Sequence, residues 1–279
     1  MKVFVAGAGI MGAGIAQVFA QADWDVTLYD INLELAQKGF AEITKALEKQ
    51  VQKGKITAAQ KSAISGRLSP CDKLTQAAPC DLVVEAIIEN VPVKKEFFKK
   101  LDNICKAETI FASNTSSGSI TEISLGLTRQ ERFLGMHFFN PAPVMKLVEI
   151  IRGQHTSDAV FTEVFTLAKA LGKEPIEVAD APGFVVNKIL APMINEAVCV
   201  LEQGVASAPD IDKAMCLGAG HPMGPLALSD LIGNDVVLNV MDTLFEETKD
   251  SKYRASLLLK KMVRAGKLGK KTGSGFYDY

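Results

Sequence analysis

Up to about residue 180, short apolar runs alternate with stretches in which apolar residues recur every three or four positions. The short runs predict β-strands, and the three-to-four spacing predicts amphipathic helices. Their alternation predicts an α/β fold with a doubly wound, mostly parallel sheet. The predicted strands cover residues 3–6, 26–29, 82–85, 110–112, 134–137 and 147–151, and the helices between them include 10–22, 91–101 and 161–171.

Two segments depart from the simplest version of this fold. Residues 33–64 carry no strand pattern and predict an inserted helical pair, with its turn at Lys53-Gly54-Lys55. Residues 148–151 predict a strand that is added to the parallel core rather than part of it.

The pattern changes at Asp180-Ala181-Pro182-Gly183, where a proline and a glycine interrupt the chain. From Phe184 onward almost every stretch predicts helix, because apolar residues recur at three-to-four spacing over residues 186–201. Further helices are expected at 236–247 and 254–263. We therefore expect two domains, residues 1–182 with the sheet and residues 183–279 entirely helical. The broad apolar stripe of the second domain can cover the first domain, a second subunit, or both.

Composition narrows the classes of partner and compartment. The chain of 279 residues holds 31 Lys and Arg against 32 Asp and Glu, so its net charge of −1 favours neither nucleic acid nor an anionic membrane. No apolar run reaches the roughly 20 residues of a membrane span, and the N-terminus shows no secretory or transit signal. Five cysteines without a CxxC pair indicate reduced thiols, and three separated histidines indicate no metal site. These features predict a cytoplasmic protein.

A glycine-rich loop follows the first predicted strand. Gly7, Gly9 and Gly12 form GxGxxG between a strand and a helix, with Ile10 and Met11 inside the loop. In a Rossmann-type fold these glycines permit a tight turn, close approach to a pyrophosphate and close helix packing, while the helix N-terminus attracts phosphate. The loop therefore predicts a dinucleotide-binding site, although glycines that serve only a turn would produce the same sequence motif.

Asp30 ends the second predicted strand. A carboxylate there can bind the ribose hydroxyls of adenosine and repels a 2′-phosphate, and no arginine follows in residues 31–33. The predicted cofactor is NAD rather than NADP, although Asp30 would serve equally as a helix cap.

His137 stands at the end of a predicted strand, where open α/β sheets bind their ligands. Glu149, twelve residues further on, can accept a hydrogen bond from one ring nitrogen and raise the basicity of the other. Ser116 follows another strand, and Asn187 opens the second domain where it could face a cleft. Each of these residues also fits a plainer role. His137 could be a hydrogen-bonded core histidine and Glu149 a solvated strand residue. Ser116 could cap a helix, and Asn187 could be a capping amide.

Over its whole length the chain resembles the short-chain L-3-hydroxyacyl-CoA dehydrogenases, and among them the bacterial 3-hydroxybutyryl-CoA dehydrogenases. The motifs that carry the resemblance are GAGIMGAGIAQ at the start, DLVVEAIIEN at 81–90, ASNTSS at 112–117, GMHFFNPAPVMKLVEII at 135–151, APGFVVNKIL at 181–190, GHPMGPLALSDLIG at 220–233 and the tail GFYDY.

This resemblance implies reversible, NAD-dependent interconversion of acetoacetyl-CoA and (S)-3-hydroxybutyryl-CoA, in a homodimer formed through the helical domain. It implies that His137 is the general acid/base, oriented by Glu149, and that Ser116 and Asn187 hold the substrate oxygen. The remaining implied contacts are Glu89, Lys94 and Asn140 with the cofactor, and Lys49 and Lys53 with the phosphates of coenzyme A.

Some features leave alternatives open. Lys49 and Lys53 share a helical face with Lys38 and Lys45, which fits a solvated surface as well as a phosphate site. Gly118 replaces the usual leucine of the family and could loosen its loop, and Ser274 replaces a basic residue. A 3-hydroxyisobutyrate- or 6-phosphogluconate-type dehydrogenase shares the glycine loop but uses a lysine and lacks HFFNP. A non-catalytic NAD-binding protein of the same fold is the alternative outside enzymes.

Overall fold

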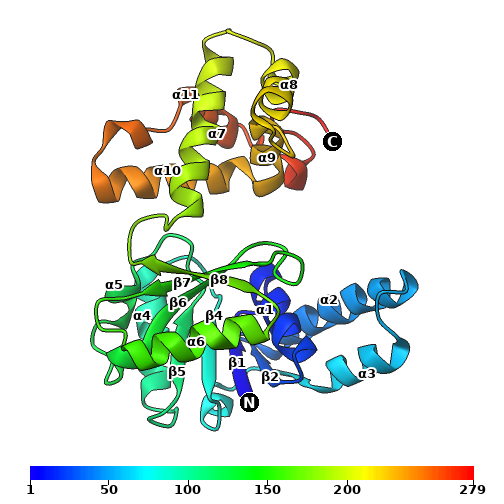
Figure 1. Ribbon diagram of the computed structural model, residues 1–279, viewed down its shortest axis with the longest axis vertical. Helices are drawn as coiled ribbons and strands as arrows, with labels where there is room; N and C mark the ends of the chain where they lie inside the picture. Colours follow the sequence, from blue (N-terminus) through cyan, green and yellow to red (C-terminus); the bar gives the residue numbers. More distant parts are fainter. The chain divides into compact units, whose positions relative to one another are not determined.

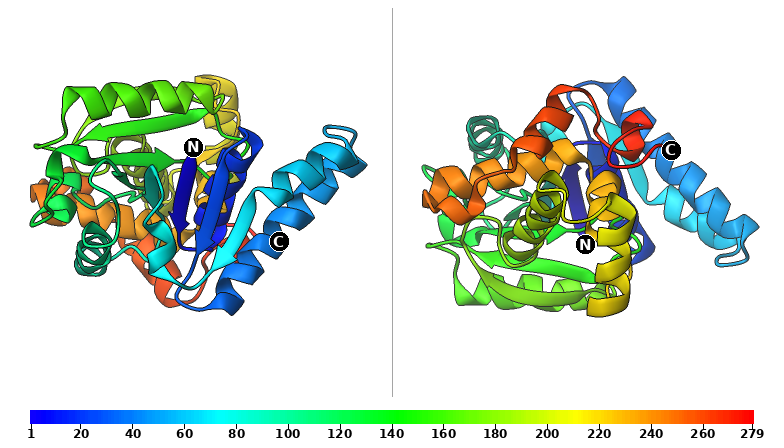
Figure 2. Two further views of the ribbon diagram at one scale, coloured as in Figure 1. Left: turned by 90° about the horizontal axis from the view of Figure 1, so that it is seen from below. Right: turned by 90° about the horizontal axis from the view of Figure 1, so that it is seen from above.

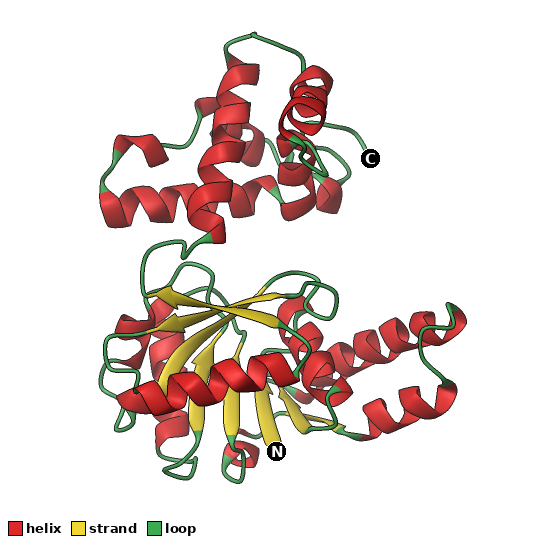
Figure 3. Cartoon of the chain, viewed as in Figure 1, coloured by secondary structure: helices red, strands yellow, loops and turns green.

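The computed structural model describes residues 1–279, which form two compact units, Met1–Ala181 and Pro182–Tyr279. The first unit is built on one eight-stranded sheet in the order β3-β2-β1-β4-β5-β6-β7-β8 (Figure 1). Its strands are β1 (Lys2–Ala6), β2 (Asp25–Tyr29), β3 (Leu68–Cys71), β4 (Leu82–Glu85), β5 (Ile110–Ser113), β6 (Phe133–Phe138), β7 (Leu147–Arg152) and β8 (Glu174–Ala179). All strands belong to this unit (Figure 3). The predicted Rossmann-type α/β fold is confirmed.

Helices cover both faces of the sheet because successive strand residues point to opposite sides. Val3 and Val5 belong to a core that also includes α1 (Ile10–Gln21) and α6 (Asp158–Ala170). The opposite face packs against α4 (Val91–Asp102), where the ring of Phe98 lies 4.7 Å from that of Phe133 between centroids. The short helix α5 (Ile120–Ser124) follows β5. The carboxyl ends of the parallel strands are thereby left for ligands.

The sheet departs from a fully parallel arrangement at β7. Strand β7 pairs antiparallel with β6, and β8 then pairs parallel with β7. The prediction of an added strand at 148–151 is therefore confirmed. Strands β3 and β8 were not predicted from the sequence, because both lie at edges of the sheet. The first contains Pro70, and the second has exposed residues at most positions, so neither shows a continuous apolar run.

The predicted helical pair is α2 (Leu33–Gln52) and α3 (Ala58–Gly66), and two views show it extending beyond the sheet (Figures 1 and 2). Gly54 adopts a φ of +66° in the turn between them, a conformation that favours glycine. Thr57 and Gln60 form a capping box that begins the second helix. The positions of both helices and the turn are thus encoded locally.

The second unit is entirely α-helical apart from short 3₁₀ turns and isolated bridges. Its helices are α7 (Val186–Glu202), α8 (Ala208–Ala219), α9 (Pro225–Ile232), α10 (Asn234–Thr248) and α11 (Leu257–Arg264). The sequence pattern predicted α7, α10 and α11 but did not separate α8 and α9. In the whole chain, no helix combines the length and apolarity that crossing a membrane requires.

Asp230 ties the C-terminal tail to this unit. Its side chain is 1% exposed and accepts hydrogen bonds from the backbone N–H groups of Phe276 at 3.0 Å and Tyr277 at 2.9 Å. Asn234 Nδ2 donates to the same carboxylate at 2.9 Å. A Cβ atom at Gly275 would lie 2.0 Å from Asp230 Oδ1, so the tail can approach this closely only with glycine there. The carboxylate therefore satisfies one buried and two half-buried donors.

We expect Asp230→Ala to destabilise the second unit by about 2–4 kcal/mol, because these donors lose their acceptor at once. Thermal unfolding and amide exchange of residues 276–279 measure this. Asp278→Ala is the matched control, because Asp278 is exposed and accepts only from the Ser274 hydroxyl, at 3.0 Å. Equal melting temperatures for the two variants would contradict this role of Asp230.

Candidate active site

The glycine loop joins β1 to α1, and its three glycines serve different needs. A Cβ atom at Gly7 would lie 2.4 Å from the Ala86 carbonyl oxygen, and one at Gly12 would lie 1.7 Å from that of Gly7. Both are required by packing within the protein. A Cβ atom at Gly9 would meet nothing within 4 Å, so no protein contact explains that glycine. The space above Gly9 fits a bound group that must approach the backbone closely, as the pyrophosphate of a dinucleotide does.

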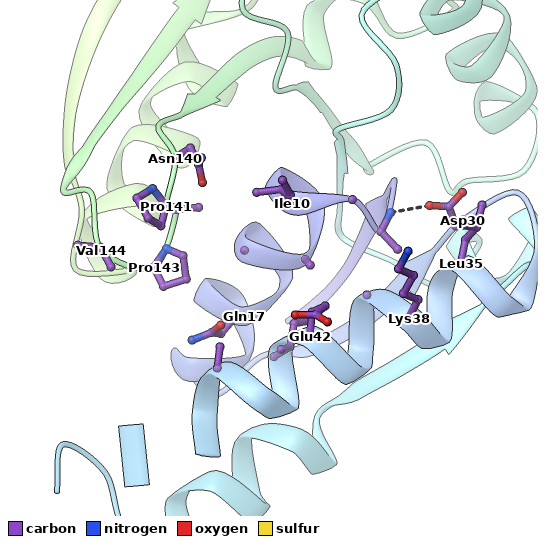
Figure 4. A pocket seen from close by; sticks show the side chains of 18 of the residues that line it. Ile10, Gln17, Asp30, Leu35, Lys38, Glu42, Asn140, Pro141, Pro143 and Val144 are labelled. Atoms are coloured by element: carbon purple, nitrogen blue, oxygen red, sulfur yellow. Dashed lines mark hydrogen bonds between the residues drawn. The ribbon is translucent and has the colours of Figure 1, made fainter. Parts of the chain in front are cut away.

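Asp30 follows β2 and holds this loop. Its Oδ2 accepts a hydrogen bond from the Ala8 N–H at 2.8 Å (Figure 4), and its Oδ1 accepts from the Ile31 N–H at 2.7 Å. A carboxylate has about four acceptor positions, so two bonds leave capacity for ribose hydroxyls. Asp30 lines the same groove as Gly9. This geometry fits the predicted adenosine contact.

The groove has a volume of about 580 Å³ and lies between α1, α2 and the segment Asn140–Val144 (Figure 4). Of the residues predicted to bind the cofactor, Gly9, Ile10, Asp30 and Asn140 line it. Met11 instead packs against the hydrophobic core. Lys38 lines the groove from α2, whereas the predicted Lys49 and Lys53 are exposed and do not.

His137 and Glu149 meet across the antiparallel pair β6–β7. They are directly opposite in the register, and His137 Nδ1 lies 2.7 Å from Glu149 Oε2. Both side chains are buried. Met136 and Phe138 belong to the core shared with α1 and α6, so His137 points to the opposite face of the sheet. A carboxylate at Nδ1 accepts the ring N–H there, and this fixes the tautomer and the ring orientation.

The loop that carries Ser116 is organised around Glu89. This carboxylate accepts hydrogen bonds from the Thr115 hydroxyl, from the Ser117 hydroxyl at 3.2 Å and from the Ser116 N–H at 3.3 Å. Gly118 is buried and donates its N–H to the Thr115 hydroxyl at 2.8 Å. This hydrogen bond holds the backbone at Gly118, and the loosening that glycine could cause there stays a prediction.

Lys94 connects Glu89 to a second carboxylate. Its Nζ lies 2.6 Å from Glu85 Oε1 and 3.3 Å from Glu89 Oε2, and the Lys94 and Glu85 side chains are 1% and 0% exposed. Burial opposes ionisation of Glu89, but the Lys94 ammonium and the hydrogen bonds from Thr115 and Ser117 outweigh it and lower the pKa of Glu89. The prediction that Lys94 contacts the cofactor stays a prediction, because in this structure its ammonium is enclosed by carboxylates.

Sequence reasoning missed Glu85. It ends β4, accepts the Ile87 N–H at 2.8 Å and accepts the Ser113 hydroxyl at 2.6 Å, so it joins the ends of two neighbouring strands. The available signal was a charged residue that closes an apolar run, because such a residue needs a buried partner.

The other predicted positions lie in the second unit. Asn187 is in the first turn of α7, and its contact with substrate stays a prediction. Ser274 donates its hydroxyl to Asp278 Oδ1 at 3.0 Å, a contact within the tail. No group of three or more His, Cys, Asp or Glu side chains is arranged to hold a metal ion.

A doubly wound sheet with a dinucleotide loop and a buried His–Glu pair is the arrangement of a nucleotide-dependent dehydrogenase. Comparison with known proteins narrows this class. Residues 2–181 match the family model "3-hydroxyacyl-CoA dehydrogenase, NAD binding domain", and residues 183–279 match "3-hydroxyacyl-CoA dehydrogenase, C-terminal domain". The chain therefore belongs to the 3-hydroxyacyl-CoA dehydrogenase family, and its predicted family and its predicted cofactor, NAD, are confirmed.

Relatives from distant organisms match the chain from end to end. It is 52% identical to the 3-hydroxybutyryl-CoA dehydrogenase of Clostridioides difficile, over 100% of this chain and 99% of that one. The mitochondrial hydroxyacyl-coenzyme A dehydrogenase of Homo sapiens is 46% identical, with 99% and 90% covered. The crystal structure of (S)-3-hydroxybutyryl-CoA dehydrogenase from Ralstonia eutropha superposes with a TM-score of 0.96 at 48% identity, covering 100% and 98%.

We expect Lys94→Met to destabilise the protein by about 3–5 kcal/mol, because it leaves the buried Glu85 carboxylate without its cation. The double variant Glu85→Gln with Lys94→Met removes both charges and is expected to recover at least half of that loss. Urea or thermal unfolding of the two variants provides the comparison. A double variant no more stable than Lys94→Met would contradict the pairing as the dominant interaction.

Proposed function

We propose that the protein catalyses the reversible, NAD(H)-dependent interconversion of acetoacetyl-CoA and (S)-3-hydroxybutyryl-CoA. The buried His137–Glu149 pair is the observation that carries this proposal, because it supplies an oriented acid/base at the sheet edge where dinucleotides bind. The names of the Clostridioides difficile and Ralstonia eutropha relatives support the choice of a short hydroxyacyl thioester.

The chemistry assigns His137 Nε2 as the atom that exchanges a proton with substrate, because Nδ1 faces Glu149. In oxidation, His137 removes the hydroxyl proton, and the Glu149 carboxylate stabilises the imidazolium that forms. NAD, when bound, accepts the hydride from the alcohol carbon. In the opposite direction, the His137 imidazolium returns the proton to the keto oxygen.

Ser116 and Asn187 are proposed to position the reacting oxygen. The contacts of Glu89 with the Ser116 N–H and with Thr115 and Ser117 support this role for Ser116, because they order the loop that carries it. Positioning groups of this kind typically contribute a few kcal/mol to lowering a barrier. Glu89, Lys94 and Asn140 are proposed as cofactor contacts, and the ion pair of Lys94 with Glu89 supports placing both near the same part of the cofactor.

Coenzyme A phosphates are assigned to Lys49, in the last turn of α2, and to Lys53, the C-cap residue that follows this helix. Their exposure supports this role, because strongly hydrated ammonium groups must remain accessible to bind a phosphate. The NAD-binding role is assigned to residues 1–182, and the substrate and dimer roles to residues 183–279. A homodimer through the helical unit is supported by its exposed apolar side chains, among them Ile189, Val205 and Leu217.

We expect His137→Ala to lower kcat for acetoacetyl-CoA reduction by about 10²–10⁴-fold while NADH binding persists, because only the proton donor is lost. Glu149→Gln should lower kcat by about 10²-fold or more, because an amide no longer fixes the required tautomer. NADH oxidation and NADH fluorescence titration measure the two effects.

His155→Ala is the matched control for these variants, because His155 is an exposed histidine away from the pair. A wild-type protein that binds NADH but turns over no 3-ketoacyl thioester would overturn the proposed activity and favour a non-catalytic NAD-binding protein.

We expect the wild type to use NADPH far less well than NADH, because the Asp30 carboxylate repels a 2′-phosphate. Asp30→Asn keeps a hydrogen-bond acceptor for the Ala8 N–H but removes the charge, so kcat/KM with NADPH should rise by about tenfold. Asp25→Asn, at the exposed start of β2, should leave both values unchanged. An unchanged NADPH value for Asp30→Asn would rule out charge repulsion as the source of the preference.

A further inference from the structure

The segment Asn140–Met145, between β6 and β7, forms one wall of the groove, and it is held from two sides. Residues 140–144 line the groove directly. On the α1 side, a Cβ atom at Gly14 would lie 3.2 Å from Ala142 Cβ and 3.4 Å from Pro143 Cδ, so the segment packs closely on the helix. Side chains of Asn140, Pro141, Pro143 and Val144 are seen along this wall in Figure 4.

Lys173 holds the same segment from the other side. It precedes β8, is 7% exposed, and its Nζ donates to the Ala142 carbonyl at 2.6 Å and to the Met145 carbonyl at 2.8 Å. Its ammonium forms no ion pair with a carboxylate. Burial lowers the pKa of Lys173 because removal from water disfavours the charged form. A buried ammonium without a counter-ion is costly, so the two carbonyl contacts are the interactions that stabilise Lys173 in this position.

Lys173 is the one donor to these two carbonyl groups in the structure. Within the segment, the Val144 and Met145 N–H groups both donate to the Pro141 carbonyl, at 2.9 and 3.0 Å, which gives a tight turn. The turn directs the Ala142 and Met145 carbonyls to the Lys173 ammonium. Without this donor, both acceptors would have to turn towards water, and the wall of the groove would move with them.

We propose that Lys173 is a positioning residue for the NAD site: it fixes the Asn140–Met145 wall of the groove without itself contacting the cofactor. The inference rests on the assignment of this groove to the dinucleotide. Lys173 directly precedes β8, an edge strand that contributes no residue to the predicted site. The proposal therefore makes cofactor affinity depend on a residue outside that site.

Lys173→Met tests the proposal, because methionine keeps an unbranched apolar stem and removes every donor. The apparent Kd for NADH should rise by about tenfold, since it scales inversely with the fraction of protein whose wall is in place. At saturating NADH, kcat should stay within about threefold, because His137 and Glu149 are untouched. Lys173→Arg, which keeps the charge and the N–H donors, should recover most of the affinity.

Hydrogen exchange supplies a readout that does not depend on the cofactor. The amides of Val144 and Met145 should exchange faster in Lys173→Met than in the wild type, without NADH present. Lys169→Met is the matched control, because Lys169 is an exposed lysine in the last turn of α6. It should change neither the Kd nor the exchange.

A folded Lys173→Met protein with wild-type NADH affinity and wild-type exchange at Val144 and Met145 would overturn the proposal. If that variant does not fold, Lys173→Gln decides, because its shorter amide reaches at most one carbonyl. A Kd for NADH that rises severalfold in Lys173→Gln supports the positioning role of Lys173, and an unchanged Kd overturns it. A wild type that fails to bind NADH would contradict the proposed function instead, and the exchange comparison would still decide the role of Lys173.

Discussion

The candidate active site depends on one strand register, the antiparallel pairing of β6 with β7. This pairing sets His137 opposite Glu149 and joins Nδ1 to Oε2 at 2.7 Å. A shift of one residue would send one side chain to the other face of the sheet, so the register alone sets the geometry of the His137–Glu149 pair. The segment that connects the two strands, Asn140–Met145, is also a wall of the cofactor groove. The turn that permits the pairing therefore also shapes the nucleotide site.

Elsewhere in the first unit, charged side chains, some of them buried, hold loops in place. Glu85, Lys94 and Glu89 link the ends of β4 and β5 to the loop of Ser116. Asp30 holds the glycine loop through the Ala8 N–H, and Lys173 holds the groove wall through two carbonyls. Burying a charged group is costly unless it is paired, and the buried Glu85, Lys94 and Lys173 are each paired with side-chain or backbone groups.

Much of the fold could be predicted from local pattern. Six strands, the helical pair and three of the later helices follow from apolar periodicity and turn residues such as Gly54. The pattern did not reveal the edge strands β3 and β8 because edge positions bury few side chains, and it did not separate α8 from α9. Glu85 and Lys173 were missed for a related reason: their partners lie elsewhere in the chain, and no period marks such pairs.

The sequence by itself determined the family, through motifs spread over the whole chain, and the glycine loop and the acidic end of β2, through residue types at a short spacing. It also predicted which histidine and carboxylate form a pair. Only the tertiary structure decided how these residues meet. It showed that β7 runs antiparallel, that Lys94 is enclosed by two carboxylates and that Gly9 faces open space while Gly7 and Gly12 do not. The physical reason is that hydrogen bonds and ion pairs between distant segments depend on register and packing, which are properties of the assembled sheet and not of any one stretch of chain.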